Sequence, residues 1–312
     1  MALFGEIRVP LAATALAALL AGPGCVDIIG ADFAKYVERE EKHFTTTGKP
    51  DVSVGTFDGS IEIRPWDRSE VQVIVEKRAA SKEAAETIEV QAEQSGNRIV
   101  VDVKVPKTQG FGIHLHYNRS ARLIVSVPAA ADVSARSGDG SIDIEGIAGH
   151  LALRSGDGSI RGRGLGGEVD AHTGDGSIRL DGVTGALSVD TGDGSIVAVG
   201  KFTSVKARSG DGSVNIAAES GSTSASDWNI STGDGSVTLA LPEDFGAEID
   251  AHTGDGGIHL QNLELSNVTG RFGKDTIRGR VGSGGSTVRV RTGDGSITLK
   301  RSLPAEATRS DR

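Results

Sequence analysis

The sequence predicts an all-β protein: a single-stranded β-helix, or solenoid, with turns of about 18 residues and a less regular β section before them. The motif Ser/Thr-Gly-Asp-Gly-Ser-Ile occurs eight times with small variations, and its first five copies follow one another at 18-residue intervals. Apolar and polar residues alternate on both sides of each motif, which indicates strands with one buried face. Only 4% of the residues are aromatic, which suits a narrow core of aliphatic side chains.

One repeat runs from Val133 to His150 and places Gly-Asp-Gly between two alternating segments. Glycine permits positive φ angles and aspartate can bond nearby backbone N–H groups, so the sequence predicts a turn at each motif. Equivalent apolar positions should stack in chain order as a column: Val133, Leu151, Val169, Leu187, Val205, Trp228, Ile249 and Val288. Consecutive hairpins are the alternative, since Asp-Gly also favours hairpins, but the constant period favours a coil.

The first 25 residues are predicted to be a signal peptide, because the apolar run from Val9 to Ala21 is too short to span a bilayer comfortably. Cys25 is the only cysteine and follows this run, as the lipid-attachment cysteine of bacterial lipoproteins does. We therefore expect lipid attachment at Cys25, with ordinary signal cleavage near this point as the alternative. Residues 26–48 are charged and are predicted to be a spacer.

Residues 49–128 are predicted to form an irregular β section that caps the solenoid, with a short helix near 81–87 that begins at Ser81. The solenoid repeats follow over 129–301, with polar loops at 217–227 and 241–247. The last two motifs are 39 residues apart, which predicts two 18-residue circuits of the coil between them. FGKDTI at 272–277 is interpreted as a decayed copy of the motif in this interval. Residues 302–312 are predicted to be a disordered tail.

Several stretches are typical of one family: TFDGSI at 56–61, LIVSVP at 123–128, the repeated motif, and LPEDFGAEIDAHTGDGGI at 241–258. In these, the chain resembles bacterial cell-envelope proteins with repeated β-strands, named as candidate adhesins and grouped as a domain of unknown function. The resemblance covers nearly the whole mature chain. It implies a β-helix and export, and it supplies no catalytic residues.

The sharpest candidate for chemistry is the central aspartate of each motif: Asp139, Asp157, Asp175, Asp193, Asp211, Asp234, Asp255 and Asp294. Stacked turns would place their carboxylates in a row about 4.8 Å apart, where neighbours repel by about 1 kcal/mol in water. Calcium-binding β-rolls carry aspartate turns on both sides of the coil, whereas here one corner of each turn carries aspartate. We therefore expect solvated, turn-forming aspartates, with a calcium site as the alternative.

A second column precedes the turns and should face outward: Arg136, Arg154, His172, Asp190, Arg208, Ser231, His252 and Arg291. Its arginines are expected to relieve the repulsion in the acidic row. The alternative is a charged stripe that binds an anionic or sugar ligand. His114 and His116 would share one strand face, but no third ligand is evident nearby, so no metal site is predicted.

The net charge of −9 argues against nucleic acid as a partner. The same side chains recur on every turn and single out no catalytic site, so no enzymatic activity is predicted. We expect a lipid-anchored structural or adhesin-like surface in the periplasm, outer membrane or cell surface, which binds a protein or glycan by repeated contacts. A carbohydrate-active β-helix enzyme with charged groups on the loops 217–227 and 241–247 is one alternative, and a self-assembling envelope scaffold is another.

Overall fold

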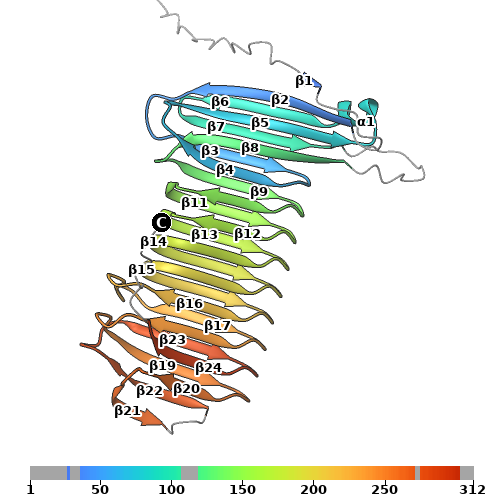
Figure 1. Ribbon diagram of the computed structural model, residues 1–312. Helices are drawn as coiled ribbons and strands as arrows, with labels where there is room; N and C mark the ends of the chain where they lie inside the picture. The colour runs from blue at the N-terminus through green and yellow to red at the C-terminus, as the bar shows by residue number, and fades with distance from the viewer. Residues whose placement is uncertain (1–26, 29–35, 107–118, 271–274, 303–312) are drawn as a thin grey trace, which may run out of the picture.

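The computed structural model describes residues 27–28, 36–106, 119–270 and 275–302. Within these residues, 24 strands form one continuous sheet and the single α-helix, α1 (Lys82–Glu86), is five residues long. The predicted all-β class is confirmed. The strands stack from β2 at one end to β21 at the other (Figure 1), as in a solenoid. In the described part of the chain, no helix has the length and hydropathy needed to span a bilayer.

We call one complete circuit of the chain around the coil a rung. In the regular part of the coil, each strand lies parallel to, and directly on, the equivalent strand of the neighbouring rung. Leu151 pairs with Val133 on one side and with Val169 on the other, and Ile160 pairs with Ile142 and Ile178. The strands of these rungs are β9 (Asp132–Ser137), β10 (Ile142–Glu145), β11 (Ala148–Ser155), β12 (Ile160–Arg163), β13 (Gly166–Thr173), β14 (Ile178–Thr191), β15 (Ile196–Ser209) and β16 (Val214–Ala218).

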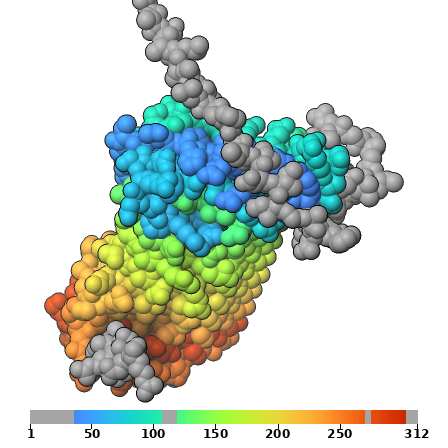
Figure 2. Space-filling model, turned by 45° about the horizontal axis from the view of Figure 1, so that its top comes forward, coloured from blue at the N-terminus to red at the C-terminus, as the bar shows by residue number. Residues whose placement is uncertain are grey.

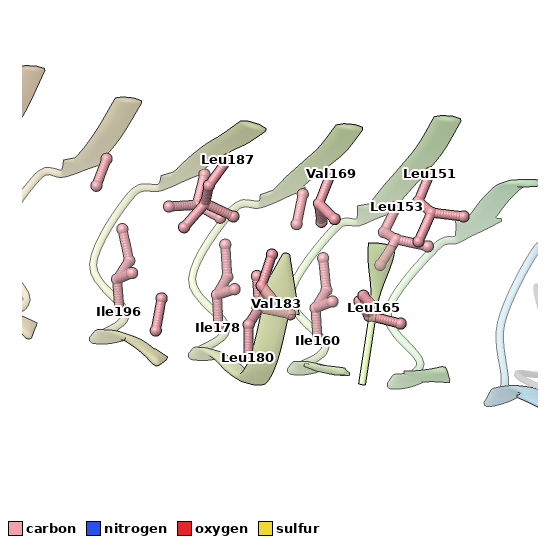
Figure 3. Close-up of a cluster of buried hydrophobic side chains, with 14 of the residues drawn as sticks. Leu151, Leu153, Ile160, Leu165, Val169, Ile178, Leu180, Val183, Leu187 and Ile196 are labelled. Carbon is pink, nitrogen blue, oxygen red and sulfur yellow. The ribbon is translucent and has the colours of Figure 1, made fainter. Parts of the chain in front are cut away.

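The core is a set of aliphatic columns that runs along the coil. Figure 3 shows Ile160, Ile178 and Ile196 in one line, facing a second line that contains Val169 and Leu187. These side chains are at most 2% exposed. Because the parallel register places equivalent residues above one another, each rung extends the same columns and buries the same face.

Aromatic rings enter the core where the chain leaves the regular repeat. Trp228 packs against Phe202 and Phe245, with ring centroids 6.1 and 5.0 Å apart, and all three side chains are buried. Trp228 directly follows the loop over 219–227, and Phe245 lies in the loop over 242–246. The three largest fully buried side chains of the described residues therefore lie together at this level.

The irregular N-terminal section forms one end of the molecule (Figure 2, blue and cyan). Strand β5 (Glu70–Ala79) lies antiparallel between β2 (Tyr36–Thr45) and β8 (Ser120–Pro128), while β6 (Glu89–Ser95) pairs with β7 (Arg98–Lys104). The short strand β1 (Asp27–Ile28) extends the edge of β2. Ser81 is the N-cap residue of α1, and its hydroxyl accepts a hydrogen bond from Ala84 N at 3.3 Å.

The predicted spacer over 26–48 is wrong for residues 36–45, which form β2. Charged residues concealed this strand in the sequence. Glu38 and Glu40 carry carboxylates 3.5 and 3.4 Å from Nζ of the buried Lys77 on β5. Pairing with β5 therefore brings a cation to Glu38 and Glu40, and Phe44 near the end of β2 is buried in the core.

The first rung in sequence is not the first rung in space. Strands β3 (Asp51–Thr56) and β4 (Ile61–Trp66) lie between the β7–β8 level and the β9–β10 level. Val52, for example, pairs with Ile99 on one side and with Val133 on the other. The strands β3 and β4, which come first in the chain, therefore form the second rung in space. The later strands β7 and β8 lie outside them, at the N-terminal end of the coil.

The C-terminal end is also out of order. Strand β23 (Thr287–Thr292) lies between β17 (Trp228–Thr232) and β19 (Ala247–Thr253), and β24 (Ile297–Arg301) lies between β18 (Val237–Leu241) and β20 (Ile258–Gln261). Figure 1 shows this last rung enclosed by earlier ones. Val288, rather than Ile249, therefore lies on Trp228, so the predicted column order is wrong here.

The predicted decayed repeat at 272–277 is wrong where the structure describes it. Ile277 belongs to β22 (Thr276–Val281), which runs antiparallel to β19 and to β21 (Ser266–Gly270). Residues 272–274 of that prediction lie outside the described residues. The 39-residue spacing arises because a hairpin outside the coil, and not an extra rung, separates the last two motifs.

Ion pairs join the inserted rung to its neighbours. Arg291 on β23 donates to Asp250 on β19 at 2.7 Å, and Arg289 donates to Asp227, just before β17, at 2.8 Å. In chain order, β19 would lie between β17 and β23, which would separate Arg289 from Asp227 but keep Arg291 next to Asp250. The pair of Arg289 with Asp227 therefore favours the observed order.

Candidate functional site

The turn motifs line one edge of the coil, and each is fixed by the hydroxyl of its first residue. Ser155 Oγ donates to the carbonyl of Gly140 in the adjacent rung at 2.9 Å and accepts from Gly158 N at 3.1 Å. The eight first residues each donate to an adjacent rung over 2.7–2.9 Å and are at most 8% exposed: Ser137, Ser155, Thr173, Thr191, Ser209, Thr232, Thr253 and Thr292.

This row of buried hydroxyls was not predicted from the sequence. The signal was present, because the first motif position is always serine or threonine although it precedes a turn on an otherwise apolar face. A buried hydroxyl needs a partner, and here the partner is the glycine carbonyl of the adjacent rung. The motif thus links the rungs at the edge where strand pairing is interrupted.

The glycines of the motif serve close approach and not the positive φ that the sequence suggested. A Cβ on Gly158 would lie 2.2 Å from the carbonyl oxygen of Gly140, far inside contact distance. Positive φ occurs instead at the opposite corner, at Gly146 (65°) and Gly164 (59°). The two kinds of corner therefore require glycine for different reasons.

All eight turn aspartates are exposed. Among the described residues, no hydrogen bond or ion pair engages any of their carboxylates, so the expected bond from aspartate to its own turn is replaced by the hydroxyl described above. Their order along the edge follows the rungs: Asp139, Asp157, Asp175, Asp193, Asp211, Asp234, Asp294 and Asp255.

The residues that the structure describes contain no group of three His, Cys, Asp or Glu side chains arranged to hold one metal ion. Calcium binding therefore stays an untested alternative, and Cys25 lies outside the described residues.

The predicted outward column lies on the strands before the turns, but its ion pairs are not with the turn aspartates. His172 Nδ1 lies 3.1 Å from Asp190 Oδ1, and the guanidinium of Arg154 lies 3.5 Å from Asp170. Arg291 pairs with Asp250. Arg154 and Arg291 are thus offset by carboxylates on their own strand face, and the acidic row keeps its charge at the edge.

Carboxylates on the C-terminal side have structural partners. Burial raises the pKa of Asp250, but hydrogen bonds from Arg291 and Arg278 outweigh this effect and hold the pKa below its usual value. Arg289 and the backbone N–H of Thr287 lower the pKa of Asp227.

The same holds in the second loop, where the Ser220 hydroxyl and Gly221 N–H lower the pKa of Asp244. Asp227 and Asp244 therefore tie the two polar loops to neighbouring segments, at 2.8 Å from Arg289 and Ser220 respectively.

A charged hollow lies on the strands that follow the turns. It has a volume of about 270 Å³. Its charged lining consists of Glu62, Arg64, Asp143, Glu145, Arg161 and Arg163. Sequence reasoning missed this site because Glu62 and Arg64 are on β4, which becomes the neighbour of β10 only through the displaced first rung.

The sequence profile of Toastrack DUF4097 matches residues 51–300, four-fifths of the chain. The chain belongs to this family. The match includes both displaced rungs and every turn motif, so the Toastrack domain accounts for nearly all of the described structure. A search of curated proteins finds no match.

The solved structures that match this Toastrack chain share little sequence with it. A candidate cell adhesion protein of Clostridium sporogenes is 14% identical, with a TM-score of 0.27, over 85% of this chain and 100% of its own. A candidate adhesin of Bacteroides fragilis is 8% identical, with a TM-score of 0.39, over 85% and 97%. A candidate lipid-binding protein of Parabacteroides distasonis is 11% identical, with a TM-score of 0.31, over 84% and 96%.

Proposed function

We propose that this Toastrack protein is an exported, non-enzymatic β-helix with 18-residue turns that serves the bacterial cell envelope as an adhesin-like interaction surface. The observation that carries the proposal is the row of eight exposed turn aspartates, which have no intramolecular partner among the described residues. Buried hydroxyls below them hold the turns in a fixed spacing. A partner that contacts several rungs gains avidity from this regular spacing without any single strong site.

The proposal includes a lipid anchor at Cys25. The apolar run from Val9 to Ala21 and the single cysteine after it support this part. A lipid at Cys25 would leave the N-terminal section next to the membrane and the repeats free to reach a protein or glycan partner. Such an anchor also gives many copies of the protein a common orientation.

Anchoring is tested with the full-length chain expressed in a Gram-negative host that is fed an alkyne analogue of palmitate. We expect label on the wild-type chain in the membrane fraction, and an unlabelled Cys25→Ala variant in the soluble exported fraction. Label that persists in the variant contradicts anchoring at Cys25. A wild-type chain that stays in the cytoplasm contradicts export.

The interaction surface is tested by sedimentation of the purified chain with isolated envelope fractions. The first variant removes three neighbouring charges from the turn edge by changing Asp157, Asp175 and Asp193 to asparagine. The matched control removes three charges elsewhere on the surface by changing Asp181 to asparagine and Glu219 and Glu243 to glutamine. We expect binding to fall only in the first variant. Equal binding by both variants and the wild type contradicts a role for the turn edge.

A further inference from the structure

The charged hollow is built from two outward columns on three neighbouring strands. Glu62, Asp143 and Arg161 form one column, and Arg64, Glu145 and Arg163 form the other, in the parallel register of β4, β10 and β12. The upper two rungs therefore contribute three carboxylates and one guanidinium, and the lower rung contributes two guanidiniums. At about 270 Å³ the hollow is near the lower limit of small-molecule sites, which is roughly 300 Å³.

The acidic side of the hollow is only partly engaged. Glu62 pairs with Arg64 and also accepts a hydrogen bond from Arg122 at 2.6 Å, so both of its oxygens have partners. Asp143 and Glu145 have only long ion pairs, at 3.8 Å to Arg161 and 3.7 Å to Arg64. Their oxygens remain available as acceptors for hydroxyl donors.

The basic side of the hollow consists of Arg161 and Arg163, and Arg179 lies beside it on β14. Arg161 lies directly opposite Arg179 of the next rung, whereas Arg163, two residues farther along the strand, lies between Glu145 and Asp181 in register. In the described part of the chain, the long contact of Arg161 with Asp143 is the only ion pair made by these three guanidiniums. Like charges directly opposite in a sheet are destabilising, and this protein is otherwise acidic. An anionic ligand at this place would relieve that repulsion.

We propose that the hollow binds an acidic saccharide of the hexuronic acid type. The planar carboxylate of the sugar fits the guanidinium forks of Arg161, Arg163 and Arg179, which bind carboxylates through paired hydrogen bonds. The sugar hydroxyls donate to Asp143 and Glu145. These two acids would repel a densely charged polyanion, so they favour a ligand that carries hydroxyls beside each carboxylate. The inference deepens the proposed function and rests on it, because it gives one part of the interaction surface a ligand class.

The test measures binding of the purified full-length chain to trigalacturonate by calorimetry, with the fully methyl-esterified trimer as the matched neutral ligand. We expect the ester, and the Arg163→Gln and Arg179→Gln variants with the acid, to bind about tenfold more weakly. Arg208→Gln, an exposed arginine outside the hollow, is the matched control and should bind like the wild type.

Asp143→Asn separates a saccharide site from simple attraction of anions. Removal of a negative charge should strengthen the binding of any bare anion, whereas replacement of one acceptor oxygen by an NH2 donor should weaken the binding of sugar hydroxyls in trigalacturonate; stronger trigalacturonate binding by this variant would contradict the saccharide site. No binding of trigalacturonate, equal binding of its ester, an equal loss in Arg208→Gln, or displacement by equimolar inorganic sulfate would each overturn the proposal. These outcomes leave the palmitate labelling and fractionation unaffected, so the two proposals fail separately.

Discussion

The hydroxyl of Thr173 donates to the carbonyl oxygen of Gly158, 2.8 Å away in the adjacent rung. Gly158 N in turn donates to Ser155 Oγ. Hydroxyls and glycine backbone groups thus alternate across these two rungs. This edge would otherwise be the weakest part of the coil, since the strands are interrupted there.

Loss of one of these buried hydroxyls should destabilise the protein, because a buried carbonyl then loses its hydrogen-bond donor. Thr191→Val keeps the shape of the buried side chain but leaves the carbonyl of Gly176 without its donor. We expect a loss of about 1 to 3 kcal/mol in the free energy of unfolding, measured by urea denaturation. Thr191→Ser keeps the hydroxyl and is the control. A valine variant as stable as the serine variant would show that this row contributes nothing.

The two kinds of glycine corner should respond differently to alanine. Gly158→Ala places a methyl group against the Gly140 carbonyl and should cost about 3 kcal/mol. Gly164→Ala has no heavy atom within 4 Å of its new Cβ and should cost only about 1 kcal/mol, from the positive φ. Melting temperatures of the two variants give the comparison. The reverse ranking would contradict the close-approach explanation.

Asp250 should make stability depend on pH. Its pKa is below the usual value in the folded protein, so its contribution is present above the unfolded pKa of about 3.9 and is lost as pH falls through the lower folded pKa. At neutral pH we expect Asp250→Asn to cost about 1 kcal/mol, and the difference from wild type to shrink in acid. Urea denaturation across pH measures it, with exposed Asp193→Asn as the control. A difference that is constant with pH would contradict this role.

The order of the C-terminal rungs can be tested with paired cysteines in a Cys25→Ser background. Thr238→Cys and Thr298→Cys lie on directly paired residues of β18 and β24 and should form a disulfide on mild oxidation, since paired strands are about 4.8 Å apart. Thr238→Cys and His259→Cys are separated by β24 and exceed the reach of about 7 Å. Free-thiol counting distinguishes them. If only Thr238→Cys and His259→Cys form a disulfide, β20 lies next to β18, and the rungs follow one another in chain order.

The sequence predicts the all-β class because period-2 alternation and a repeated turn are local signals. It could not predict the positions of Ile249 and Val288, because both fit the same column equally well, whereas the pair of Arg289 with Asp227 forms only when β23 lies next to β17. The strand at 36–45 was missed because Lys77, which neutralises its acids, lies more than thirty residues away. The hollow was missed for a similar reason, since its walls come from β4 and β12.

The displaced rung at the C-terminal end affects how the chain can fold. Winding from the N-terminus, one rung at a time, cannot complete the coil, because β19 and β20 precede β23 and β24 in the chain but lie beyond them in space. A polypeptide that ends before residue 287 lacks the strands that join its last rung to the rest. The protein therefore closes its coil only when nearly the whole chain is present, and incomplete copies are left with open strand edges that proteases can recognise.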